Sequence, residues 1–112
     1  MDEVVLLYTT WPDRASAETA GRAAVEAGLC ACVNVLAPTT SIYRWEGAVE
    51  SATETPMIVK TSRAAAEAAR TLLIERHPYD LPAVAALPVD AKASSPDFLR
   101  WIAAESAGSA HR

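Results

Sequence analysis

The chain has 112 residues, of which 51% are hydrophobic and 21% are charged, and its formal net charge is −4. This length suits one domain with a single core. The acidic balance disfavours a nucleic acid or an anionic membrane as the main partner, and no apolar run approaches the roughly 20 residues that span a bilayer. We therefore expect one soluble domain over residues 1–106 and a disordered tail over residues 107–112.

Two features of the chain favour the cytoplasm. The start of the chain, Met1-Asp2-Glu3, carries two acidic residues where a secretory signal is basic. The only cysteines, Cys30 and Cys32, lie two positions apart on a predicted strand, where a strain-free disulfide does not form. Their sulfurs would share one strand face and could hold a soft ion such as Cu(I). The alternative is that they fill the core as small apolar side chains.

The first third of the chain predicts a strand, a helix and a second strand. Residues 3–10 are a continuous run of β-formers, typical of a strand central in a sheet. Asp13 can cap the helix that follows, and Gly28 can end it. A small-residue face, which lets a helix lie close to a sheet, is formed by Ala17, Ala20, Ala24 and Ala27. Residues 29–36 are again β-like.

A long β-hairpin is predicted next. Residues 39–45 are rich in β-branched and aromatic side chains, Glu46 and Gly47 form a turn signal, and the returning strand runs to residue 61. Pro56 in that strand implies a bulge or an edge position. Arms of more than ten residues are about twice the usual strand length. The hairpin should therefore protrude from a domain this small.

The remaining residues predict a helix, a short core strand and a last helix. Ser62 can cap a helix over residues 63–76, and residues 81–87 form the strand. The last helix begins at residues 95–97, and one face of it is formed by Phe98, Trp101 and Ile102. The order β-α-β-β-α-β plus a C-terminal helix predicts an α+β, ferredoxin-like domain with a four-stranded antiparallel sheet.

Several side chains are candidates for contacts with partners. The tip of the hairpin carries Tyr43, Arg44, Trp45 and Glu46. Aromatic residues and arginine are enriched in buried interfaces, so an interface with another chain is the first interpretation, and a solvent-facing ligand platform is the alternative. Lys60 is either an anion-binding group or a solvated charge at a strand end. His77 is either a metal ligand, an acid–base group or a cap of the preceding helix.

No catalytic constellation is recognisable in the chain. It contains no Gly-x-Ser-x-Gly, no glycine-rich phosphate loop and no His-Glu-x-x-His. We expect that the protein is not an enzyme. The open alternative is an enzyme that uses His77 with Tyr79 or Asp80 as acid and base.

Six ordered motifs closely resemble the CutA divalent-cation-tolerance family. They are residues 8–13, 31–34, 41–47, 60–61, 77–82 and 97–101. The resemblance extends from about residue 4 to residue 105, and it implies a homotrimer with the architecture of the PII signalling proteins. The long hairpins would pair edge to edge with neighbouring subunits, and closing three of them in a ring removes edges that otherwise invite uncontrolled pairing.

The resemblance also implies a cleft between subunits and a weak metal site. The cleft candidates from the matching motifs are Cys32, Tyr43, Trp45, Lys60 and Tyr79. Copper-binding members of the family use a strand cysteine and two consecutive histidines, where this chain has Tyr8 and then Arg76 with His77. His77 is therefore the one metal candidate. We expect no tightly bound cofactor and only weak binding of Cu(II) or another divalent cation.

The function that the resemblance implies is that of a cytoplasmic homotrimer linked to divalent metal tolerance. It would bind metal ions weakly, or a small ligand, in clefts between its subunits. The alternative is a PII-like signalling module that reports a small anion, through Lys60 and the cleft, to a partner protein.

Overall fold

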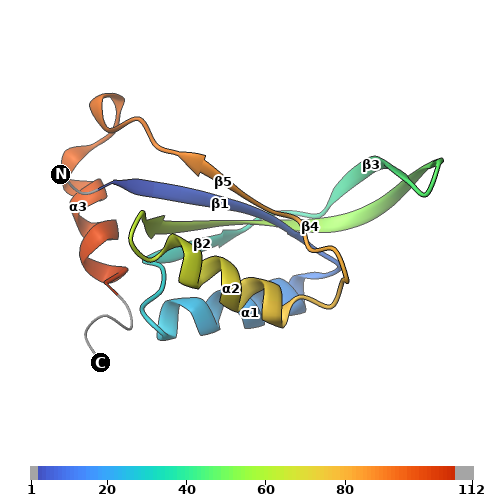
Figure 1. The fold of residues 1–112 in the computed structure, drawn as a ribbon, viewed down its shortest axis with the longest axis horizontal. Coiled ribbons are helices and arrows are strands. Elements are labelled where there is room, and N and C mark those ends of the chain that lie inside the picture. Colours follow the sequence, from blue (N-terminus) through green and yellow to red (C-terminus); the bar gives the residue numbers. More distant parts are fainter. Residues whose placement is uncertain (1–2, 108–112) are drawn as a thin grey trace.

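One antiparallel sheet runs through the length of the molecule (Figure 1). The structure is a computed structural model that describes residues 3–107. The strands are β1 (Val4–Trp11), β2 (Cys32–Val35), β3 (Thr39–Trp45), β4 (Ala48–Ser62) and β5 (Val84–Pro88). Their order across the sheet is β2-β4-β1-β5, and β3 pairs with the outer half of β4. The predicted α+β class and antiparallel sheet are confirmed.

Helices cover the two faces of the sheet unequally. The helices are α1 (Arg14–Glu26), α2 (Ala66–Arg76) and α3 (Pro96–Glu105), with a short 3₁₀ turn at Ala91–Ala93. α1 and α2 lie side by side under one face (Figure 1). Successive residues of a strand point to opposite faces: Val5 belongs to the core under α1 and α2, whereas Val4 packs with α3. Among the described residues, the face opposite α1 and α2 is therefore covered only at one end, by α3.

The sheet has five strands instead of the predicted four because one long edge strand is interrupted. β2 and β3 follow each other along the same edge of β4. Val35 lies opposite Met57 and Thr39 lies opposite Glu54, so the three residues 36–38 face only two residues of β4. The extra residue breaks the ladder at this point.

A bulge or an edge position is predicted at Pro56, and the structure has an irregularity beside Pro56 that lies on the neighbouring segment, residues 36–38, and not on β4 itself. β4 pairs with β1 without interruption from Ser62 to Thr55. The carbonyl of Pro56 accepts a hydrogen bond from the Leu36 N–H at 2.9 Å, which places the proline nitrogen toward the break between β2 and β3. A residue with no N–H costs no ladder bond there, so proline is tolerated inside this long strand.

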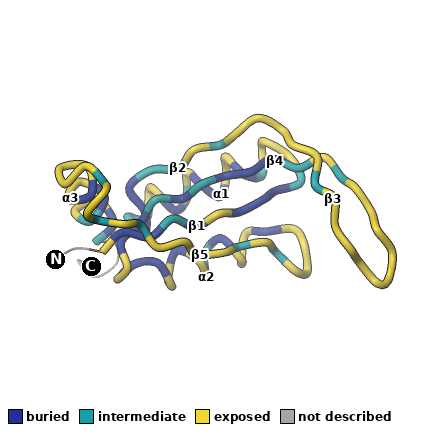
Figure 2. Tube along the Cα trace, turned by 90° about the horizontal axis from the view of Figure 1, so that it is seen from above, coloured by how far each residue is buried: buried dark blue, intermediate teal, exposed yellow. Residues whose placement is uncertain are grey.

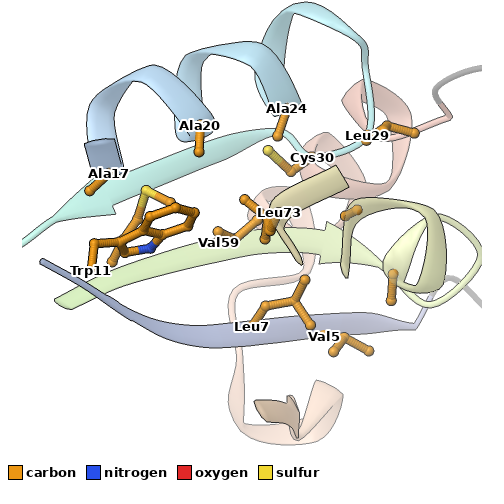
Figure 3. Packing of buried hydrophobic residues seen from close by; sticks show 13 residues of the cluster. Val5, Leu7, Trp11, Ala17, Ala20, Ala24, Leu29, Cys30, Val59 and Leu73 are labelled. Atoms are coloured by element: carbon orange, nitrogen blue, oxygen red, sulfur yellow. The ribbon is translucent and has the colours of Figure 1, made fainter. Parts of the chain in front are cut away.

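The core lies between the sheet and the helices α1 and α2 (Figure 3). Inward-facing strand residues include Val5, Leu7, Trp11, Met57 and Val59, each at most 5% exposed. The predicted small-residue face is confirmed at Ala17, Ala20 and Ala24, each at most 1% exposed. These alanines let α1 approach the sheet closely, which leaves room for the indole of Trp11 beneath it (Figure 3).

Both predicted ends of α1 are confirmed. Asp13 accepts a hydrogen bond at Oδ1 from the Ser16 N–H at 2.8 Å, and that bond is the main reason why the pKa of Asp13 is lowered. Gly28 follows the helix with φ of +71°, a left-handed conformation that glycine adopts without strain.

Two predicted elements have different bounds in the structure. α2 begins at Ala66 instead of residue 63, because β4 continues to Ser62 and the N–H of Arg63 still bonds the Glu3 carbonyl at 2.9 Å. The Ser62 hydroxyl instead accepts from the Ala65 N–H, inside the turn before the helix. The last strand begins at residue 84, and most of it is exposed at the edge of the sheet.

The predicted inward face of α3 is also wrong in part. Leu99 and Ile102 are the buried residues, whereas Phe98 and Trp101 are each 43% exposed and stack on one another. The apolar residues of this helix occupy two neighbouring rows, and only one row can face Val4. Periodicity could not tell which row that would be.

The predicted protruding hairpin is present, and we call residues 39–54 the arm. It extends beyond the body of the domain, and most of its residues are exposed (Figure 2). Glu46 and Gly47 at its tip have φ of 49° and 83°, so both central residues of the turn are left-handed.

Within residues 3–107, no helix is both long and apolar enough to cross a membrane. The predicted tail falls mainly on residues 108–112, which lie outside the described residues.

Gly21 is the position in α1 where a larger residue should destabilise the fold. A Cβ there would lie 2.8 Å from Met57 Sδ and 2.9 Å from Val33 Cγ2. Although alanine favours helix, we expect Gly21→Ala to lower the free energy of unfolding by about 1 kcal/mol or more, because overpacking outweighs propensity. Urea denaturation measures the change, with Thr19→Ala on the exposed face as the control. A stabilised Gly21→Ala variant would contradict the close packing.

Candidate functional site

A pocket of ≈ 650 Å³ opens where the arm leaves the body of the domain. One wall is a face of the arm, on which Tyr43 lies directly opposite Glu50 and which also carries Glu54. The other wall is the loop over residues 78–83, which leads from α2 to β5. We call this the arm pocket. Its volume is within the range of about 300–1,000 Å³ that is usual for small-molecule sites.

His77 fixes the position of the loop wall. Its Nε2 is 2.7 Å from the Thr10 carbonyl oxygen, and its Nδ1 accepts the Tyr79 N–H at 3.1 Å. A carbonyl only accepts and a backbone N–H only donates, so the ring is neutral with its proton on Nε2. The imidazole also stacks on Trp11 with centroids 4.2 Å apart and is 92% shielded from solvent. His77 thus ties the end of β1 to the loop that carries Tyr79.

A chain of buried hydrogen bonds supports this histidine from below. The indole N–H of Trp11 donates to Thr9 Oγ1 at 2.7 Å, and the Thr9 hydroxyl donates to the Met57 carbonyl at 2.8 Å. Thr9 and Trp11 are both 0% exposed. Fully satisfied buried polar groups of this kind hold their side chains in one arrangement. Thr9 and Trp11 therefore form a rigid support for His77, and the hydrogen bond from the Tyr79 N–H to His77 holds Tyr79 in a fixed position.

Negative charge dominates the electrostatics of the arm pocket. Burial, followed by the carboxylates of Glu50 and Glu54, raises the pKa of the Tyr43 phenol. Burial, followed by the carboxylates of Glu54 and Asp13, raises the pKa of the Tyr79 phenol. Both phenols are therefore neutral near pH 7, where they can donate hydrogen bonds and present uncharged rings to a ligand.

The structure brings together some of the predicted site residues and separates others. Tyr43, Arg44, Trp45 and Tyr79 line the arm pocket, from the arm and from the loop. The lining also includes Glu50 and Glu54, which our reading of the sequence missed. The signal that could have found them is their spacing, since residues four apart on one strand lie on the same face.

Cys32 and Lys60 lie elsewhere, on the face of the sheet that α1 and α2 leave open. They are opposite each other on β2 and β4. The Nζ of Lys60 is 5.4 Å from the ring centroid of Phe98 on α3, a cation–π contact. Cys30, in contrast, is buried in the main core, where desolvation is the main cause that raises its pKa to about 12. The Cys30 thiol stays protonated and fills space in the core. This is the alternative in which the cysteine acts as a small apolar side chain.

Metal-binding geometry is sparse in the part of the chain that the structure describes. No three side chains of His, Cys, Asp and Glu come together there in a way that could hold one ion. His77 uses both ring nitrogens in hydrogen bonds to the backbone. A metal ion at His77 would have to displace one of these bonds, which makes a tight site unfavourable.

Known proteins match this chain over nearly all of its length. The model of a family described as CutA1 divalent ion tolerance protein matches residues 5–105. The chain belongs to this family. The divalent-cation tolerance protein CutA of Pectobacterium atrosepticum is 39% identical over 101 residues, which are 90% of this chain and 89% of that protein. Protein CutA of Mus musculus is 37% identical over 85% of this chain, but this chain spans only 52% of the mouse protein.

The fold agrees with solved structures of the CutA1 family. The structure of the PII-like protein CutA from Nostoc sp. PCC 7120 in apo form superimposes with a TM-score of 0.82 at 33% identity, covering 93% of this chain and 96% of that one. The family resemblance of the six motifs is thereby confirmed.

Removing the His77 side chain should loosen the loop wall. Because His77→Ala leaves the Thr10 carbonyl and the Tyr79 N–H without partners, we expect a loss of about 2 kcal/mol or more of unfolding free energy. Urea denaturation measures it, with the exposed neighbour Arg76→Ala as the control. His77→Gln and His77→Asn, whose amides replace one bond each, should recover part of the loss. Equal stability of His77→Ala and Arg76→Ala would contradict the role assigned to the ring.

Proposed function

We propose that this protein is a homotrimer of PII-like architecture that binds a small ligand in the arm pocket and thereby takes part in divalent metal ion tolerance. The observation that carries the proposal is the arm pocket itself, a concave site of suitable size at the base of an arm that reaches beyond its own domain. The proposal includes a ferredoxin-like classification, supported by the strand order and by α1 and α2 on one face.

The open face of the sheet supports self-association. Tyr8, Ile58 and Leu87 point to this face, where Tyr8 lies opposite Ile58 and neighbours the strand that carries Leu87. Tyr8 is 39% exposed and Leu87 is 48% exposed in the single chain. A sheet normally buries its apolar face against another layer. Neighbouring copies would supply that layer, and ring closure would also cover the free edge of the arm.

The role in metal tolerance does not require a catalytic centre or a tight metal site. We propose a non-enzymatic protein without a resident cofactor, which binds Cu(II) or another divalent cation only weakly. The hydrogen bonds of His77 to the backbone support this, because they leave its ring nitrogens occupied. We place the protein in the cytoplasm, where the thiols of Cys30 and Cys32, both free in the structure, would stay reduced.

A second candidate function is PII-like signalling to a partner protein. The observation that favours it lies on the far side of the arm from the arm pocket, where Ile42 is 73% exposed and Val49 is 65% exposed. Apolar side chains on a projecting hairpin are suited to contact another protein. If the protein signals in this way, the ligand in the arm pocket would change the position of the arm. Lys60 would not bind an anion in the arm pocket, since Lys60 is not among the residues that line this pocket.

Light scattering tests the assembly. We expect a molar mass of three times the 11.9 kDa of one chain. Leu87→Asp should shift the mass toward one subunit, because a buried, unpaired carboxylate at the open face opposes association. Val25→Asp, an equal change on the exposed side of α1, should leave the trimer intact. A single-chain mass for the unmodified protein would reject the proposed assembly.

Calorimetric titration tests the metal proposal. Because no three ligating side chains converge among residues 3–107, we expect a dissociation constant for Cu(II) on the order of 10 µM or weaker. His77→Gln, which keeps the contact with Thr10, should bind Cu(II) no more than a few-fold more weakly. Submicromolar binding that is lost in His77→Gln would show instead that the ring leaves its backbone partners to hold copper.

A further inference from the structure

The charged residues of the arm pocket are mainly acidic. Among residues 3–107, three carboxylates line it, those of Glu50, Glu54 and Asp80, whereas Arg44 is the one basic residue of its lining. The carboxylates come from both walls, two from the arm and one from the loop. An anionic ligand would meet net repulsion at this site, and a cationic ligand would meet net attraction.

The same pocket is walled by aromatic rings. Tyr43 and Trp45 lie on the arm, and Tyr79 lies on the loop that His77 holds in place. The face of an aromatic ring carries negative electrostatic potential and attracts ammonium groups within about 6 Å. Rings also bury the apolar body of an organic ligand. The aromatic walls therefore favour an organic cation over an inorganic one.

Glu54 is the carboxylate best placed to pair with such a cation. It is half-buried, whereas Glu50 and Asp80 are exposed. Its charge also acts on both phenols, since it contributes to raising the pKa of Tyr43 and of Tyr79 from opposite walls. A carboxylate that is partly shielded from water interacts more strongly with an ion pair partner than an exposed one.

The spread of the carboxylates argues against a single metal ion as the occupant. In the described part of the chain, no three potential ligands come close enough to share one ion. Metal ions need ligand oxygens that converge within about 2–2.6 Å of one point. The pocket of ≈ 650 Å³ instead has room for a ligand of several non-hydrogen atoms.

From the carboxylates, the aromatic walls and the volume, we infer that the arm pocket binds a small organic cation, an ammonium group carried on an apolar or aromatic body. The ammonium group pairs with Glu54, and the body lies between the rings of Tyr43 and Tyr79. This inference rests on the proposed function of the arm pocket as a ligand site and adds the chemical class of the ligand.

Three probes of similar size and different charge test the inference. They are 2-phenylethylammonium, 2-phenylethanol and phenylacetate, titrated at low salt and followed by calorimetry and by the tryptophan fluorescence of the protein. We expect the cation to bind at least about tenfold more tightly than the alcohol and the anion not to bind measurably. Raising the ionic strength to about 0.5 M should weaken the binding of the cation and leave the binding of the alcohol unchanged.

Variants locate the binding. Glu54→Gln should weaken the binding of 2-phenylethylammonium about fivefold, and Glu50→Gln should weaken it about twofold, because the carboxylate of Glu54 is more shielded from water than that of Glu50. Glu75→Gln makes the same change of net charge on the exposed side of α2, outside the lining of the arm pocket, and should leave the affinity unchanged. An equal response of all three variants would overturn the inference, because it would indicate a general charge effect.

The outcomes also separate this inference from the function on which it rests. If phenylacetate or 2-phenylethanol binds as tightly as the cation and Tyr43→Ala or Tyr79→Ala abolishes that binding, the arm pocket is a ligand site but the cationic class is wrong. If none of the three probes binds, and the thermal unfolding of the protein is unchanged by each at millimolar concentration, both the cationic class and the ligand site are overturned.

Discussion

The length of β4 is the constraint on which the rest of the structure depends. Its fifteen residues pair with β1 and β2 inside the body and with β3 outside it. The inner half is held by buried side chains such as Met57 and Val59, whereas the outer half is mostly exposed (Figure 2). β4 itself runs without a break from the core into the arm, where its pairing changes from β1 and β2 to β3. The arm can therefore form one wall of a pocket, although its residues contribute almost nothing to the hydrophobic core of the domain.

His77 illustrates how a residue of a family motif can act through structure. A histidine followed by proline and tyrosine attracts attention as a ligand, but this ring lies between Trp11 and Tyr79 and satisfies two backbone groups. The free-energy cost of leaving either group unpaired in a buried position is larger than the free energy gained from a weak bond to a metal ion. The contribution of His77 to the arm pocket is the position that it gives to Tyr79, which no spacing rule reveals.

The lining of the arm pocket combines negative charge with aromatic rings. Cations of any kind are attracted by the carboxylates around Glu54, but only a ligand with an apolar body uses the aromatic walls as well. The open face of the sheet, with Lys60 and Cys32, has a different chemistry and lies toward α3. The residues that the family resemblance placed in one cleft thus divide between two surfaces of the single chain, and only further copies of the chain could bring them together.

The sequence by itself determined the elements and much of the core. The run of β-formers in β1, the alanine face of α1, the cap at Asp13 and the stop at Gly28 are local signals, because they depend on backbone geometry and on residues close together in the chain. The tertiary structure alone decided which row of α3 faces inward, where the ladder beside Pro56 breaks, and that Glu50 and Glu54 share a pocket with Tyr79. Each of these depends on contacts between residues far apart in the chain, and such contacts are set by how the elements pack, which no local pattern encodes.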